Sequence, residues 1–266
     1  MDLSRLDRRI IYLLLLAAVA IPLTLKVNLP VSVGPETQKV YDAIDALPQG
    51  SRIMISFDIE ASSLPEIQPV AIAIIKHAFS KDLHIIGLAL FSEGTAIGYN
   101  LLSSIARSYD KEYGDDFIYL GYRPQYVSAI LGMGENIRDV FPLDYRNENW
   151  LDFPAFSDLS DYDDIPLVVS LADGSLPTYW VEYAGARYGQ KVATGLTAVM
   201  ATSYYPYTAS GQLEGLVGGL KGASEYEKLL GYSGGGQRGM LAQSSGHLMI
   251  VLLVIIANLA AWRRKL

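Results

Sequence analysis

The sequence contains no cysteine and only three histidines in 266 residues. The absence of cysteine excludes disulfide bonds, thiolate metal sites and cysteine nucleophiles. Three histidines are too few for most zinc sites built from imidazole ligands. Basic residues are also scarce, with 21 Lys and Arg against 28 Asp and Glu, and the formal net charge is −7. A general nucleic-acid-binding protein needs a basic surface, so we expect no nucleic-acid partner.

The chain also lacks the short motifs of common enzyme classes. It contains no G-x-x-x-x-G-K-[ST] and no H-E-x-x-H. The sequence therefore predicts no catalytic residue and no enzyme. An extracytoplasmic enzyme built on this chain would have to use Asp58, Glu60 or Asp173 as its general acid or base.

Two long apolar runs lie near the ends of a chain that is 50% hydrophobic. The first covers residues 10–25 and predicts a transmembrane helix over 10–26. A signal peptide cleaved near Ala20 is the alternative, but the apolar run continues past that point, which favours a retained anchor. The second run precedes a cationic cluster and predicts a transmembrane helix over 246–262, with Trp262 at the interface.

The basic residues predict the orientation of both helices. They lie outside the two apolar runs, at Arg5, Arg8 and Arg9 and again at residues 263–265. The positive-inside rule then places both termini in the cytoplasm. We therefore expect a two-pass protein of the cell membrane. Its segments would be cytoplasmic tails over 1–9 and 263–266, an extracytoplasmic domain over 27–232, and a flexible tether over 233–245.

Short β-branched runs alternate with longer amphipathic segments between the two ends. This alternation predicts an α/β fold with a doubly wound, mostly parallel five-stranded sheet in a three-layer sandwich. A long acidic segment over 141–164 interrupts the pattern and is expected to be a solvated loop. The expected strands are 52–57, 83–91, 117–122, 165–172 and 191–201, and the expected helices are 36–47, 65–80, 95–113, 124–140, 176–188 and 210–230.

Polar side chains follow several of the expected strands. In open parallel sheets, ligands bind outside the carboxyl ends of the strands, so these side chains form a candidate ligand-binding rim. Ser175 also stands where a helix N-cap belongs, which is an alternative role for it. The candidate ligand-binding residues are Asp58, Glu60, Ser62, Arg123, Asp173, Ser175, Tyr204 and Tyr205.

Part of this rim has a family counterpart. Residues 58–62 read Asp-Ile-Glu-Ala-Ser after the first strand, and Asp173-Gly174 ends the fourth. These nine or so positions resemble the metal-ion-dependent adhesion site of von Willebrand factor A domains, which has D-x-S-x-S after its first strand. The resemblance implies Mg²⁺ or Ca²⁺ held by Asp58, Ser62 and Asp173. Glu60 replaces the family's first serine, and its threonine ligand has no assigned counterpart.

Glycines recur every four residues in the last expected helix. Gly211, Gly215 and Gly219 would share one face of a helix over 210–230 and permit close packing on the sheet or on a partner subunit. Combined with the two anchors, this face predicts a structural or interaction subunit of a membrane assembly, with other subunits or a second copy as partners. The alternative is a ligand- or divalent-metal-binding sensory module that uses the strand-end rim.

Overall fold

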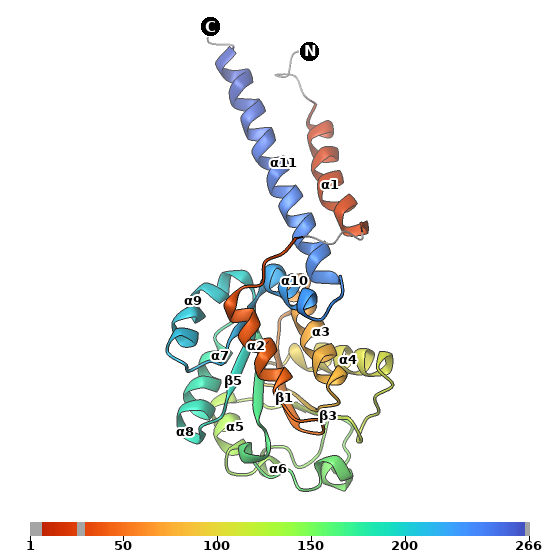
Figure 1. Cartoon of the computed structure of the whole chain (residues 1–266), viewed down its shortest axis with the longest axis vertical. Coiled ribbons are helices and arrows are strands. Elements are labelled where there is room, and N and C mark those ends of the chain that lie inside the picture. Colours follow the sequence, from red (N-terminus) through yellow and green to blue (C-terminus); the bar gives the residue numbers. More distant parts are fainter. Residues whose placement is uncertain (1–6, 26–29, 264–266) are drawn as a thin grey trace.

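The computed structural model describes residues 7–25 and 30–263 and contains one six-stranded, all-parallel sheet (Figure 1). Arg5, Arg264 and Lys265, on which part of the predicted orientation depends, lie outside the described residues. The strand order is β3-β2-β1-β4-β5-β6, so the direction of winding reverses between β1 and β4. The strands are β1 Arg52–Asp58, β2 His84–Ala89, β3 Phe117–Tyr122, β4 Leu167–Ala172, β5 Val192–Leu196 and β6 Leu216–Gly218.

Helices cover both faces of the sheet, because the two windings from β1 and β4 place their crossovers on opposite sides. One buried cluster packs beneath the first group of helices and includes Phe57, Phe79 and Tyr226. These helices are α2 Pro35–Asp45, α3 Leu64–Ser80, α4 Gly94–Ser108 and α10 Gly219–Leu229.

The opposite face carries a second buried cluster, which includes Trp150, Phe156 and Trp180. The first two belong to the acidic segment 141–164, so its aromatic side chains anchor that segment in the core. The elements around this face are α5 Tyr126–Met133, α6 Ile137–Val140, α7 Leu176–Tyr179, the π-helix η6 Trp180–Gly185, α8 Ala186–Tyr188 and α9 Ala198–Ala209. Short 3₁₀ turns complete the chain at η2 Ala61–Ser63, η3 Trp150–Asp152, η4 Pro154–Phe156 and η5 Tyr162–Asp164.

The predicted helix over 210–230 is wrong. The chain turns at Gly211, where φ is +77°, forms the sixth strand β6, and enters α10 only at Gly219. Backbone pairing with β5 stabilises this arrangement: the N–H of Thr194 donates to the carbonyl of Gly215 at 3.3 Å. The predicted strand over 191–201 also ends early, because α9 begins at Ala198. The three glycines therefore do not share a helix face.

Gly215 nevertheless lies in a tight contact within the domain. A Cβ added there would lie 2.7 Å from the carbonyl oxygen of Glu36 and 2.9 Å from a methyl group of Val40. Both belong to α2, so the absence of a side chain at Gly215 lets α2 approach β6. This contact is internal and gives no support to a subunit interface at the glycines.

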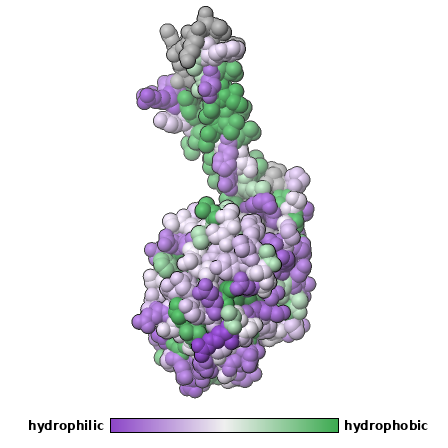
Figure 2. Space-filling view, turned by 90° about the vertical axis from the view of Figure 1, so that its left-hand side faces the viewer, coloured by the Kyte–Doolittle hydropathy of each residue, from purple (hydrophilic) through white to green (hydrophobic). Residues whose placement is uncertain are grey.

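Two helices project from the domain as a stalk, defined here as α1 Arg8–Thr24 and α11 Gly235–Arg263 beyond Met240 (Figure 1). Among the described residues, one helix, Gly235–Trp262, is long and apolar enough to cross a membrane. The transmembrane helix predicted over 10–26 is not among the helices that meet this criterion. Helix α1 has 17 residues and packs on α11, where the Ser245 hydroxyl donates to the Ala18 carbonyl at 2.8 Å. Figure 2 shows hydrophobic side chains gathered on this stalk.

The predicted flexible tether over 233–245 is wrong over most of its length, because α11 begins at Gly235. Its three consecutive glycines suggested flexibility from composition alone. In the fold, the backbone N–H groups of Gly234, Gly236 and Gln237 donate to the buried carboxylate of Glu227, which holds the first turn of α11 in place.

Candidate functional site

A cavity of about 230 Å³ opens where the sheet reverses its winding, at the carboxyl ends of β1 and β4. The crossovers that leave β1 and β4 diverge to opposite faces, so a crevice forms between them, and this is where open α/β sheets bind ligands. We call it the carboxyl-edge cavity. It is lined by Asp58, Glu60, Leu90, Phe91, Tyr126, Ala172, Asp173, Gly174, Ser175, Leu176 and Tyr179.

Asp58 is the most deeply buried acid of this cavity, with 2% of its surface exposed. Its Oδ2 accepts a hydrogen bond from the Ser56 hydroxyl at 2.6 Å, and its Oδ1 accepts one from the backbone N–H of Leu90 at 2.7 Å. Burial raises the pKa of Asp58 from 3.8 to about 6, although these hydrogen bonds favour the ionised form. The nearby Asp173 carboxyl raises the Asp58 pKa further. Asp58 can therefore change charge near neutral pH.

Asp173 and Glu93 hold the loop that follows β1. Asp173 Oδ2 accepts hydrogen bonds from the Glu60 N–H at 2.9 Å and from the Ser63 hydroxyl. Glu93 Oε2 accepts one from the Ala61 N–H at 3.1 Å. Acids from the ends of β4 and β2 thus fix this loop from both sides, and Glu60 is held at the cavity.

Two tyrosines form the other wall of the cavity. Tyr126 at the start of α5 and Tyr179 at the end of α7 are half-buried, and their ring centroids lie 4.5 Å apart. The hydrogen bond with Tyr179 raises the pKa of Tyr126, so the phenol stays neutral. No Lys, Arg or His stands among the described residues that line the cavity. The site thus combines carboxyl groups with aromatic rings and has no basic side chain of its own.

The structure brings four of the eight predicted ligand-binding residues together. Asp58, Glu60, Asp173 and Ser175 all line the carboxyl-edge cavity. Ser62 lies beside it, with its hydroxyl 3.4 Å from Glu60 Oε2.

The other three predicted residues lie elsewhere. The buried Tyr204 hydroxyl donates to the carbonyl of Gly174 at 3.3 Å, behind the lining, and Tyr205 is half exposed on α9. Arg123 donates to the carbonyl of Val140 and lines a separate cavity of about 390 Å³.

Sequence reasoning missed the aromatic wall. Tyr126 and Tyr179 stand at helix ends, four and seven residues beyond the strands that precede them. Helix packing, rather than chain proximity, carries their rings to the cavity. Only the high tyrosine content, 18 residues, hinted that aromatic rings would gather somewhere in the fold.

A metal site is not evident from the donor groups. Among residues 7–25 and 30–263, no three His, Cys, Asp or Glu side chains come together in a group that could hold a metal ion. Both Asp58 oxygens already accept hydrogen bonds, and Ser62 does not line the cavity. The metal set of Asp58, Ser62 and Asp173 stays a prediction.

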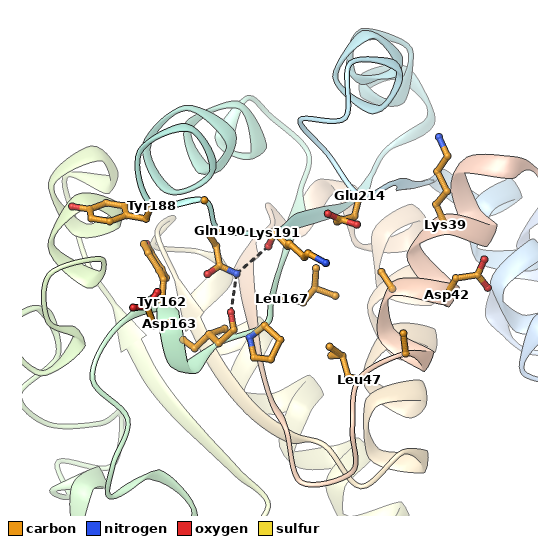
Figure 3. Close-up of a pocket in the computed structure, with 15 residues that line it drawn as sticks. Lys39, Asp42, Leu47, Tyr162, Asp163, Leu167, Tyr188, Gln190, Lys191 and Glu214 are labelled. Atoms are coloured by element: carbon orange, nitrogen blue, oxygen red, sulfur yellow. Dashed lines mark hydrogen bonds between the residues drawn. The ribbon is translucent and has the colours of Figure 1, made fainter.

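A second, larger cavity of about 810 Å³ lies at the opposite edge of the sheet, beside the amino ends of β4, β5 and β6. We call it the amino-edge cavity. Figure 3 shows Lys39 on α2 and Lys191 and Glu214 ahead of β5 and β6, around an apolar base that includes Leu47 and Leu167. Its charges have both signs, and its two lysines are exposed.

No family model, curated protein or solved structure matches this chain. Its function is therefore inferred from the geometry and chemistry of the cavities and of the stalk.

Proposed function

We propose that this protein is a membrane-anchored binding protein whose carboxyl-edge cavity takes a small organic cation, such as a primary or quaternary ammonium compound. One observation carries the proposal. Three carboxyl groups and two tyrosine rings line a single cavity at the reversal point of the sheet, with no basic side chain among the lining residues.

The chemistry of an ammonium group matches this lining. Carboxylates attract the positive charge, and a half-buried site screens that attraction less than open water does. Tyrosine faces add a cation–π attraction of about 0.5–2 kcal/mol. A bound cation also favours the ionised form of Asp58 and so lowers its pKa from about 6. Binding should therefore strengthen as the pH rises through 6.

Membrane anchoring rests on the stalk. Leu13 and Leu16 of α1 and Leu248 and Trp262 of α11 are more than half exposed, which water disfavours and a bilayer accommodates. We propose that α1 crosses together with α11, with both termini in the cytoplasm and the domain outside. At 1.5 Å per residue, α1 covers roughly 26 Å of a hydrocarbon core of about 30 Å, a deficit that snorkelling arginines can bridge.

A structural or interaction subunit of a membrane assembly is the second candidate. The amino-edge cavity favours it, since an open hollow of about 810 Å³ with lysines and acids around an apolar base suits a charged segment of another protein. Mass measurement after extraction in mild detergent tests it: a particle heavier than one chain supports an assembly, and a single chain argues against one.

The ligand proposal is tested by thermal melting of the full chain in detergent at pH 7. Tetramethylammonium and methylammonium should raise the melting temperature, whereas tert-butanol, a neutral molecule of similar shape, should not. A ligand at 100 times its dissociation constant adds about 2.7 kcal/mol. Asp58→Asn should remove most of the shift, and Glu214→Gln at the amino-edge cavity should retain it.

Three outcomes would contradict the proposal. They are an equal shift with tert-butanol, a full shift in Asp58→Asn, and no shift with either ammonium salt. A shift with Mg²⁺ or Ca²⁺ alone would instead support the metal site that the resemblance implies.

A further inference from the structure

Helix α10 holds the first turn of α11 through one buried side chain. Glu227 is 1% exposed, and its two carboxylate oxygens accept hydrogen bonds from the backbone N–H groups of Gly234, Gly236 and Gln237, at 3.0, 2.7 and 3.0 Å. The first N–H groups of a helix have no partner within that helix. A buried carboxylate that satisfies two of these groups, together with the N–H of Gly234 just before the helix, fixes both the position and the direction of α11.

The glycines at this point permit contact rather than motion. A Cβ on Gly236 would lie 2.7 Å from the Cβ of Ala223, and one on Gly234 would overlap the Glu227 carboxylate. Only residues without a side chain allow the two helices to approach so closely. Gln237 is buried at the same junction.

The same helix also holds the segment that follows α1. Lys228 donates from its ammonium group to the carbonyl of Val31 at 2.5 Å. The buried Glu225 carboxylate accepts a hydrogen bond from the Thr37 hydroxyl at 2.7 Å. One turn of α10 therefore contacts the segment that follows α1, the start of α2 and the first turn of α11.

The path of α11 shows which edge of the domain faces the stalk. Gly236 lies beside Ala223 and Gly239 beside Leu220, so α11 runs back along α10 toward its first residue. That residue, Gly219, directly follows β6 and lies against Ala198, which follows β5. Helix α11 thus leaves the domain at the carboxyl edge of the sheet, the edge that holds the candidate ligand cavity.

Little of α11 remains to separate the domain from a bilayer. The part beyond Met240, up to Trp262, has about 22 residues and a length of roughly 33 Å. A transmembrane helix needs about 20 residues for the hydrocarbon core alone. Almost the whole projecting segment is therefore used in crossing.

We infer that α10 is a rigid clamp that fixes the domain against the lipid surface with its carboxyl edge, and hence its ligand cavity, facing the bilayer. The inference depends on the membrane anchoring proposed above and not on the identity of the ligand. The domain then has a fixed orientation at the membrane, whereas the predicted flexible tether would have left it free to rotate.

Trypsin tests the clamp directly. Arg238 is exposed on the first turns of α11, and trypsin cleaves there only if the helix unwinds. The native chain in detergent should resist cleavage after Arg238. Glu227→Gln keeps the side-chain shape but loses the carboxylate that accepts three N–H groups, so cleavage there should become at least tenfold faster. Glu182→Gln, an exposed acid on η6, is the matched control and should behave as the native chain. Equal cleavage in all three proteins would overturn the clamp.

The orientation is tested in the otherwise native chain, so the result does not depend on whether Glu227→Gln folds. Because the protein has no cysteine, single spin labels can be placed at Val199→Cys, on the carboxyl edge, and Ser157→Cys, near the amino edge. The vesicles contain a lipid with a Ni²⁺-chelating headgroup, so paramagnetic Ni²⁺ lies at the lipid surface. The spin label at residue 199 should relax several-fold faster than the label at residue 157, because it lies closer to that surface. Equal relaxation, or faster relaxation at residue 157, would overturn the inference.

A flotation assay separates this failure from that of the proposed anchoring. Vesicles that float without the protein would contradict the anchoring itself. Vesicles that carry it while both labels relax equally would contradict the fixed orientation alone, and the ammonium-binding proposal would be unaffected by either result.

Discussion

The two edges of the sheet each carry a cavity, and the smaller one has the stronger functional chemistry. The amino-edge cavity is more than three times larger, at about 810 Å³ against 230 Å³, but its lysines are exposed and its charges mixed. The carboxyl-edge cavity contains an acid that is 98% buried and whose pKa is about 6. Burial of a titratable group, rather than the size of a hollow, thus distinguishes a candidate binding site.

The difference follows from how the chain enters and leaves the sheet. At the carboxyl edge, the segments after β1 and β4 diverge to opposite faces and leave a crevice at the strand ends. Asp58, the last residue of β1, lies in this crevice and accepts a hydrogen bond from the backbone N–H of Leu90. At the amino edge, the acids that line the cavity, Asp42, Asp163 and Glu214, are exposed or half-buried.

The largest expected effect is at Gly94, where α4 begins. A Cβ added there would overlap the carbonyl oxygen of Phe57, a backbone atom that cannot move aside. Gly94→Ala should lower the free energy of unfolding by about 4 kcal/mol, measured by denaturant titration. Gly189→Ala at the amino edge, where the space is open but φ is +72°, should cost about 1–2 kcal/mol. Equal losses would contradict the tighter packing of the carboxyl edge.

The second effect is a fall in stability between pH 4 and 6 that comes from Asp58 at the carboxyl edge. The folded-state pKa of Asp58, about 6, lies above the value of 3.8 for a free carboxyl, so the folded chain binds the proton more tightly. Stability should therefore fall as the pH rises from about 4 through 6, by roughly 3 kcal/mol. Asp58→Asn should remove this fall, and Asp163→Asn at the amino-edge cavity should not. An unchanged pH profile in Asp58→Asn would refute the assignment.

A third, smaller effect tests the contact between α2 and β6 near the amino edge. If Gly215 were an exposed residue of a helix, as the sequence predicted, its replacement by alanine would stabilise the protein by about 1 kcal/mol. Gly215 is instead packed against Glu36 and Val40, so Gly215→Leu should lower the free energy of unfolding by about 2 kcal/mol. The mass of the particle extracted in mild detergent should be the same for this variant as for the native protein. A lighter particle with normal stability would restore the idea of a glycine interface.

The smallest effect is expected at the rim of the amino-edge cavity. Lys191 is exposed and has no ion-pair partner among the described residues. Lys191→Ala should change the free energy of unfolding by no more than about 0.5 kcal/mol and leave ammonium binding as it is. A loss of binding in this variant would move the ligand to the larger cavity and reverse the comparison of the edges.

Apolar β-branched runs were sufficient to predict five of the six strands, and Phe117–Tyr122 has the predicted bounds. The sixth strand was missed because it has three residues and exists through its pairing with β5. The tether was mispredicted because glycine composition carries no information about a buried partner such as Glu227, which lies seven residues before Gly234. The four acids and hydroxyls at strand ends were predictable from topology, whereas the tyrosine wall depends on helix packing.

The central claim is that a cation bound in the carboxyl-edge cavity lowers the pKa of Asp58. The most direct test is the number of protons released on binding. Calorimetric titration of tetramethylammonium into the full chain at pH 6, in two buffers of different ionisation enthalpy, measures it. Because Asp58 is half protonated at its pKa and a bound cation ionises it, the native chain should release about half a proton per ligand. Asp58→Asn should release none. A binding heat that is independent of buffer in the native chain, or equal release in both proteins, would contradict the claim.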